Sequence, residues 1–286
     1  ARWRAMWVAA LIILGISFDA TCGFPGEGPA WAVCSLNVTS FAGKKERLVA
    51  DLVGEKEILA MQETHHRVGD EARSRGLLLS AGLSSVWGVP VPGVGGGGTG
   101  GIGFLGPDGA VAPLLVGGEV VRGTNRWGAC LIPPSWSGMG KAVALMSVYG
   151  VVGGDKYPHA CAGTAEVIRE VQEVLVRWGG AWIVVGDVNM DPAKVPGLAD
   201  WCARGIAAEV GGLGGGGEST YVVGSSASRL SSVWCSKELV AGWIESVVQA
   251  RGVSGHLGVR VSFRGARVSD VGWVLPVAPV VSSRLV

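Results

Sequence analysis

Short apolar runs recur along most of the chain and predict the strands of a buried sheet. Runs of roughly four to eight apolar or alternating residues, bounded by polar or glycine-containing stretches, are typical of strands. They lie at Trp31–Val38, Ile58–Gln62, Gly101–Phe104, Trp127–Ile132, Ala142–Tyr149, Trp182–Val185, Ser231–Cys235 and Val259–Phe263.

Between these runs, two segments have apolar residues at helical spacing, and a third is a candidate short helix. Thr164–Trp178 has the clearest apolar stripe, and we expect Thr164 to cap its N-terminus, Glu166 to lie in its first turn and Gly179 to end it. The second segment is Lys44–Gly54, and the candidate short helix is Pro196–Arg204. Strands that alternate with helices predict an α/β layered domain.

The 286 residues are enough for one large domain or two small ones. We expect an N-terminal segment at 1–30, a domain at 31–264 and a tail without clear periodicity at 265–286. In the first of these, Arg2 and Arg4 precede an apolar stretch, Met6–Ile16, that matches either a buried strand or the core of a signal peptide. The stretch is too short to span a membrane.

Composition narrows the classes of function. The net charge is +1, so a strongly basic face for tight non-specific binding of nucleic acid is not indicated. Six cysteines without a CxxC pair and four histidines argue against a structural zinc site and for buried thiols, which favours an intracellular protein without excluding the signal-like segment. Two glycine runs, Gly95–Gly98 and Gly214–Gly217, indicate loop insertions.

Polar residues follow or flank several of the predicted strands, where side chains have no packing role and ligands often bind. Each alone has an ordinary structural interpretation, such as a turn, a solvated charge or a packed histidine. The order and spacing of the whole set is what suggests a site. Its members are Asn37, Gln62–Thr64, Tyr149, Asp187, Asn189 and His256.

This order of motifs resembles the endonuclease/exonuclease/phosphatase family, which has the DNase I fold and includes apurinic and retroelement endonucleases. The resemblance runs from about Trp31 to Phe263, and Gln-Glu-Thr-His and Gly-Asp-x-Asn are its most specific parts. The matching stretches are Ser35–Val38, Met61–His65, Ser147–Tyr149, Gly186–Asn189, Thr220, Ser228–Leu230 and Ser254–His256.

The resemblance implies a four-layer α/β/β/α sandwich that binds Mg²⁺ or Mn²⁺. Glu63 would bind the metal with help from Asn37. Asp187 would orient and deprotonate the attacking water, and Asn189 would hold the phosphate or the nucleophile. A hard cation with carboxylate and amide oxygen ligands suits phosphoryl transfer, which depends on positioning and charge neutralisation.

The family pattern gives the remaining site residues their roles. Tyr149 would donate a hydrogen bond to a phosphate oxygen, and His256 would stabilise the charge that develops on the phosphoryl oxygens. Thr220 and Ser228 would contact the substrate. Nucleic acid is the expected partner; the sequence does not indicate an oligomeric state.

Two positions depart from the pattern, because Ser231 and Gly255 stand where the family has aspartates. One of those carboxylates partners the histidine in the family. A histidine with a pKa near about 6.5 is mostly neutral at pH 7, and loss of the orienting carboxylate in a comparable triad costs about four orders of magnitude in rate.

The first hypothesis is therefore a metal-dependent phosphodiester hydrolase acting on nucleic acid, with impaired activity left open. A second is a catalytically inactive relative that acts as a binding module or is a mobile-element relic. A third is a phosphatase of small phosphorylated lipids or sugars. The His65–His66 pair beside Glu63 is a weaker metal signal, because adjacent histidines usually point apart.

Overall fold

The computed structural model describes residues 30–41, 49–90, 100–154, 156–211, 219–223, 225–249 and 256–264. The expected N-terminal segment, except its last residue, and the whole 265–286 tail lie outside this part of the chain, as do both glycine runs. Of the expected helix Lys44–Gly54, only 49–50 are described as helical. Within the described residues, no helix is both long and apolar enough to cross a lipid bilayer.

The first sheet has six strands in the order β15-β16-β1-β2-β4-β3. Its central strands, β1 and β2, run parallel, and their neighbours β16 and β4 run antiparallel to them. The strands are β1 (Ala30–Asn37), β2 (Glu57–Gln62), β3 (Leu83–Trp87), β4 (Ile102–Pro107), β15 (Trp243–Gln249) and β16 (Gly258–Arg264).

The second sheet also has six strands, in the order β11-β14-β10-β9-β8-β5. Its central pair, β9 and β10, is again parallel, and β8 and β14 flank the pair in antiparallel orientation. The strands are β5 (Ala112–Pro113), β8 (Trp127–Ile132), β9 (Val143–Tyr149), β10 (Trp182–Asp187), β11 (Ala207–Glu209) and β14 (Ser231–Ser236). The two sheets thus repeat one arrangement.

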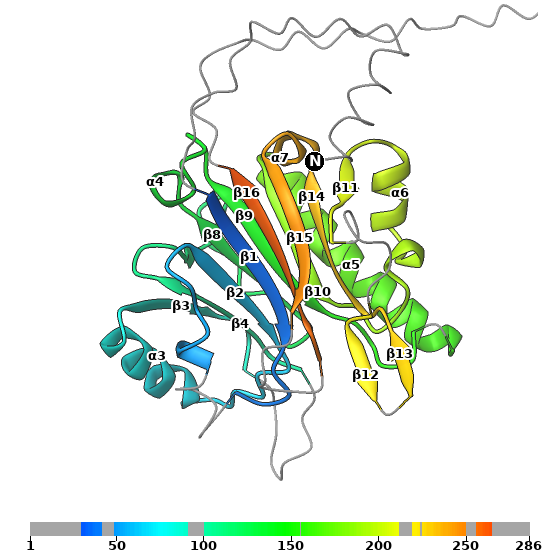
Figure 1. Ribbon diagram of the computed structural model, residues 1–286, viewed down its shortest axis with the longest axis horizontal. Helices are drawn as coiled ribbons and strands as arrows, with labels where there is room; N and C mark the ends of the chain where they lie inside the picture. The colour runs from blue at the N-terminus through cyan, green and yellow to red at the C-terminus, as the bar shows by residue number, and fades with distance from the viewer. Residues whose placement is uncertain are drawn as a thin grey trace, which may run out of the picture.

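Two hairpins and six helical segments complete the described fold. The hairpins pair β6 (Leu115–Val116) with β7 (Glu119–Val120) and β12 (Tyr221–Val223) with β13 (Ser226–Ser228). The β12–β13 hairpin projects from the lower edge of the molecule (Figure 1). The helical segments are α3 (Asp70–Ser80), α4 (Pro134–Ser137), α5 (Pro158–Trp178), η1 (Pro192–Lys194), α6 (Leu198–Ala203) and α7 (Lys237–Val240).

The sheets pack face to face, with helices on their outer faces (Figure 1). Alternate residues of each strand form a shared apolar core between the sheets, to which β10 contributes Ile183 and Val185 and β1 contributes Val33. The outer face of the second sheet packs against α5 and α6, and that of the first packs against α3. The expected α/β/β/α sandwich is confirmed.

Helix α5 begins earlier than the sequence predicts. Pro158 occupies its first turn, which suits proline because the fixed φ is helical and no amide donor is needed there. Thr164 is therefore not the cap: it lies buried within the helix, and its hydroxyl accepts a hydrogen bond of 2.9 Å from the Val151 amide. Glu166 likewise lies beyond the first turn. Gly179 ends the helix with a left-handed φ of 66°, as predicted.

Close packing between β10 and β9 leaves no room for a side chain at Gly186. A Cβ added there would lie 2.1 Å from the carbonyl oxygen of Val148 on β9. We expect Gly186→Ala to lower the free energy of unfolding by on the order of 3 kcal/mol. Gly76→Ala is the control, because Gly76 has open space around its Cα in α3 and should gain about 0.5–1 kcal/mol. Urea denaturation measures both, and equal effects would contradict the packing.

Candidate active site

Backbone hydrogen bonds join the loops that follow β1 and β2 at one edge of the sandwich. The Ser40 and Phe41 amides donate to the carbonyls of Glu63 and Thr64 at 2.7 and 2.9 Å. The Thr64 amide donates in turn to the Gly101 carbonyl at 3.1 Å, just before β4. The Glu63 turn is therefore held from both sides.

The same set of hydrogen bonds continues into the second sheet. The Gly101 amide donates to the Asn125 carbonyl, and the Tyr149 amide donates to the Arg126 carbonyl, each at 2.7 Å. Residues 125 and 126 precede β8, and Tyr149 ends β9. The ends of the two sheets therefore form one continuous rim, and the polar residues of this rim come from both halves of the fold.

Asp187 lies at the centre of this rim and is fully buried. The Asn37 side-chain amide, from the other sheet, donates to its Oδ2 at 2.9 Å, and the Asn189 backbone amide donates to its Oδ1 at 3.1 Å. The His256 Nδ1 lies 3.3 Å from the same Oδ2. Two segments distant in sequence, around Asn37 and His256, thus converge on the carboxylate of the 187–189 segment.

The surroundings of Asp187 raise the pKa of its carboxyl group above the ordinary value. Burial is the largest cause, and the neighbouring charge of Glu63 acts in the same direction. The imidazole of His256 and the hydrogen bonds from Asn37 and Asn189 oppose the rise. The carboxylate is thus held in place by donors, but its charge is only partly compensated.

Glu63 and Tyr149 form the second part of the cluster. Glu63 has a left-handed φ of 55°, and the Tyr149 hydroxyl donates a hydrogen bond to its carboxylate. Burial and this carboxylate raise the pKa of Tyr149 well above its usual value, so the phenol keeps its proton at neutral pH. The expected contact of Tyr149 with a phosphate stays a prediction, because in this structure its proton faces Glu63.

Asn189 is positioned by an unusual backbone. Its φ of 53° is left-handed, and its side-chain amide donates to the Gly150 carbonyl at 3.1 Å. Gly150 has no room for a side chain, because a Cβ would lie 2.2 Å from the Val188 carbonyl oxygen. With the amide nitrogen fixed on Gly150, the Asn189 side-chain oxygen is the atom left to face a nucleophile or a ligand.

Thr220 directly precedes the β12–β13 hairpin, and Ser228 is the last residue of β13. The buried Thr220 hydroxyl accepts the amides of Leu230 and Ser231 at 2.8 and 2.9 Å, so it orders the start of β14. Ser228 is exposed, and its carbonyl accepts the Thr220 amide. A substrate contact by either residue remains a prediction. His256 pairs with Tyr221 through an isolated bridge, which carries the imidazole to the rim.

Ser231 lies directly opposite Asp187 in the antiparallel pair of β10 and β14. Opposed residues point to the same face of a sheet, so the Ser231 side chain is directed into the space between the sheets beside Asp187. It is 3% exposed. The carboxylate that faces His256 is Asp187 itself. Gly255, the other substituted position, lies outside the described residues.

Arg126 is a rim residue that the sequence interpretation missed. Its guanidinium lies 4.9 Å from the centre of the Tyr149 ring and donates to the Gly150 carbonyl at 3.1 Å. The prediction considered mainly residues at the carboxyl ends of strands, but Arg126 precedes β8. An antiparallel strand begins at the edge where its parallel neighbours end, so residues before such strands deserve equal weight.

The donors at the rim fit a hard divalent cation. Carboxylate and amide oxygens are the ligands that Mg²⁺ and Mn²⁺ prefer, and such ions often take only one or two carboxylates, completing their shell with water and phosphate. Burial is the main cause of the raised pKa of Asp187, and the charge of Glu63 adds to it, so a cation at the rim would offset the charge of these two carboxylates. Among the described residues, no three His, Cys, Asp or Glu side chains gather into a metal cage.

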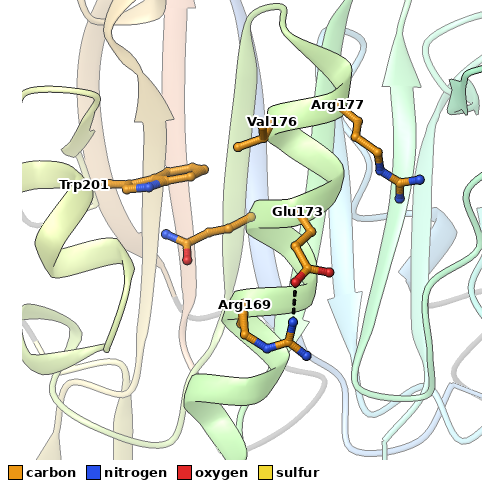
Figure 2. Close-up of a pocket in the computed structure, with 6 residues that line it drawn as sticks. Arg169, Glu173, Val176, Arg177 and Trp201 are labelled. Carbon is orange, nitrogen blue, oxygen red and sulfur yellow. Dashed lines mark hydrogen bonds and ion pairs between the residues drawn. The ribbon is translucent and has the colours of Figure 1, made fainter.

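A surface hollow of about 510 Å³ lies elsewhere, on the outer helical layer. Figure 2 shows Val176 and Trp201 beside it, together with the charged side chains of Arg169, Glu173 and Arg177. None of the rim residues lines it. We therefore place the candidate chemistry at the rim, where carboxylate, amide and imidazole groups converge.

Solved structures match this fold, although neither a family profile nor a curated protein sequence matches the chain. The AP endonuclease LMAP from Leishmania major has a TM-score of 0.61 and 16% identity, covering 87% of this chain and 91% of its own. The endonuclease domain of TRAS1, a telomere-specific non-LTR retrotransposon, has a TM-score of 0.56 and 16% identity, covering 84% and 100%.

A third match is the 3′ phosphatase NExo from Neisseria, bound to a product DNA hairpin. It has a TM-score of 0.55 and 16% identity, covering 82% of this chain and 99% of its own. The chain therefore has the DNase I-like fold of the endonuclease/exonuclease/phosphatase proteins.

The raised pKa of Asp187 predicts that its charge destabilises the fold. Below the ordinary aspartate pKa of about 3.9, the carboxyl is protonated in both the folded and the unfolded state, so it does not lower the free energy of unfolding. As pH rises toward the elevated folded pKa, the unfolded state ionises first and stability falls. We therefore expect Asp187→Asn to have a higher melting temperature than the wild type at pH 8 and nearly the same melting temperature at pH 4. Calorimetry in the presence of a chelator measures both. A lower melting temperature at pH 8 would contradict this.

Proposed function

We propose that the protein is a divalent-metal-dependent phosphodiester hydrolase that acts on nucleic acid. The observation that carries the proposal is the convergence of Asn37, Asn189 and His256 on the buried Asp187 carboxylate, beside the Tyr149–Glu63 pair. The fold supports it, since the structures that match include endonucleases and a 3′ phosphatase with a DNA hairpin.

Asp187 is the proposed base for the attacking water. A carboxylate with a raised pKa is a stronger base than an ordinary one. The Asn37 amide and the Asn189 backbone fix its two oxygens, so the acceptor is oriented before substrate arrives. The Asn189 side-chain oxygen would hold the same water or a substrate hydroxyl.

His256 is the proposed stabiliser of phosphoryl charge. Its Nδ1 faces Asp187 at 3.3 Å, which leaves Nε2 as the nitrogen that would donate to a phosphate oxygen. A hydrogen bond from this nitrogen would stabilise the negative charge that develops on the phosphoryl oxygens in the transition state. One carboxylate thus serves two neighbours, the water and the imidazole.

Glu63 would hold Mg²⁺ or Mn²⁺, and this cation would neutralise charge on the phosphate and lower the pKa of a bound water. The Tyr149 hydroxyl restricts the Glu63 carboxylate to one orientation. Arg126, stacked on the Tyr149 ring, adds a fixed positive charge to the same side of the rim. At a net charge of +1, these local charges would carry much of the attraction for a nucleic-acid backbone.

A cleavage assay tests the function directly. We expect the purified protein to nick supercoiled plasmid DNA with Mg²⁺ or Mn²⁺ and to stop in EDTA. Asp187→Asn and Glu63→Gln should each lower the rate by about 100-fold or more, because they remove the base and the cation ligand. Glu173→Gln is the control, since Glu173 lies exposed on α5 and pairs only with Arg169 among the described contacts. Negligible rates for wild type and Asp187→Asn alike would remove the hydrolase proposal.

An inactive relative that only binds is the second candidate, and Ser231 is the observation that favours it. Asp187 has no carboxylate opposite it on β14, so the base and the imidazole partner are the same group. Calorimetric titration with Mg²⁺ separates the two: the hydrolase binds the cation at Glu63, whereas a relic that has lost its metal site gives no binding heat.

Restoring a carboxylate at position 231 should increase activity. An aspartate there would point into the same space as Asp187 and would free Asp187 from its contact with His256. We expect Ser231→Asp to cleave plasmid DNA at least about tenfold faster than the wild type. In a comparable catalytic triad, the orienting carboxylate contributes about four orders of magnitude to the rate. Ser231→Asn, of equal shape but uncharged, should show no gain. Equal rates for the two variants would contradict the assignment of His256.

A further inference from the structure

The Glu63 turn holds its carboxylate by means of an unfavourable backbone. Glu63 and His65 have φ values of 55° and 53°, a left-handed conformation that L-residues adopt only when their surroundings require it. The cost must be offset by contacts around the turn. Removal of such contacts should therefore let Glu63 leave its place without unfolding the protein.

Part of the restraint is backbone pairing to the segment before β4. The Thr64 and His65 amides donate to the carbonyls of Gly101 and Gly100, each at 3.1 Å. Gly100 itself has a φ of 106°, and a Cβ there would lie 2.4 Å from the Asn125 carbonyl oxygen. These bonds fix the middle of the turn and leave its exit to be held by another group.

His66 occupies that exit and is 4% exposed. Its ring centre lies 4.0 Å from that of Trp87 on β3 and 5.3 Å from that of Phe41 after β1. Its Nε2 lies 3.1 Å from the hydroxyl of Ser74, which is fully buried on α3. One imidazole therefore links the Glu63 turn to α3, β3 and the loop after β1.

We propose that His66 is a positioning residue that fixes the Glu63 carboxylate through its contact with Ser74. An apolar ring would fill the space between Trp87 and Phe41, but it would leave the direction of the chain after His65 undefined. A hydrogen bond between two buried groups is directional and costly to leave unmade. The consequence for metal binding rests on the function proposed above.

Two substitutions of His66 separate the hydrogen bond from the packing. His66→Phe keeps an aromatic ring against Trp87 and Phe41 and removes the nitrogen. His66→Gln removes the ring and keeps a polar group at the height of Nε2. Ser74→Ala removes the partner and leaves His66 intact, so it serves if a His66 variant does not fold. Trp178→Phe is the control for general destabilisation, because it removes the 3.0 Å bond to the Ala181 carbonyl at the far end of α5.

Native-state amide hydrogen exchange, followed by NMR, is the main readout. We expect His66→Phe and Ser74→Ala to speed exchange of the Thr64 and His65 amides at least tenfold more than that of the β10 amides. The double variant should add little, since both changes break one contact. His66→Gln should stay closer to the wild type. Mn²⁺ titration should show roughly tenfold weaker binding in the two variants, as for groups that orient metal ligands.

If a variant speeds hydrogen exchange uniformly at all amides, as expected for Trp178→Phe, the proposal is overturned and His66 is a packing residue. Unchanged exchange at Thr64 and His65 would overturn it as well. If the wild type binds no Mn²⁺ while the two amides respond as expected, the positioning role stands and the proposed metal function fails. The two inferences are therefore tested separately.

Discussion

The structure depends on one costly interaction, the burial of the Asp187 carboxylate between two sheets. A charge removed from water must be satisfied by donors, and here they come from Asn37 on the opposite sheet and the Asn189 backbone, with the His256 Nδ1 3.3 Å away. Because Asn37 lies far from Asp187 in sequence and on the other sheet, its hydrogen bond forms only when both halves of the sandwich are packed together. The same burial raises the pKa of Asp187, which supports its proposed role as a base.

Backbone hydrogen bonds around Asp187 fix the relative positions of the strand ends that form the rim. Backbone hydrogen bonds run from the Glu63 turn through Gly101 to Asn125, and a second set joins Arg126, Tyr149 and Gly150 to Asp187. Left-handed residues at Glu63 and Asn189 aim two of the proposed functional side chains. Strain of this kind persists where neighbouring structure holds it, and it is common at functional sites.

Much of the fold could be predicted from the sequence, because buried central strands leave continuous apolar runs such as Trp182–Val185. Elements at the periphery could not. Helix α3 buries only Ser74 and Leu78 and has little apolar periodicity, and β15 has no buried residue. The N-terminal error in α5 arose because Thr164 has the chemistry of a cap but faces Val151 inside the helix. Arg126 was missed because it precedes a strand instead of following one, and its position depends on packing with Tyr149. His66 was considered only as a weak metal signal, because its contact with Trp87 depends on tertiary packing.

A cation at Glu63 would complete this carboxylate cluster. Anomalous diffraction from crystals soaked in Mn²⁺ tests it most directly. We expect a manganese peak within about 2.0–2.3 Å of the Glu63 carboxylate, on the side of the rim that faces Asp187. A peak bound only at another surface, or no peak at all under saturating Mn²⁺, would contradict it.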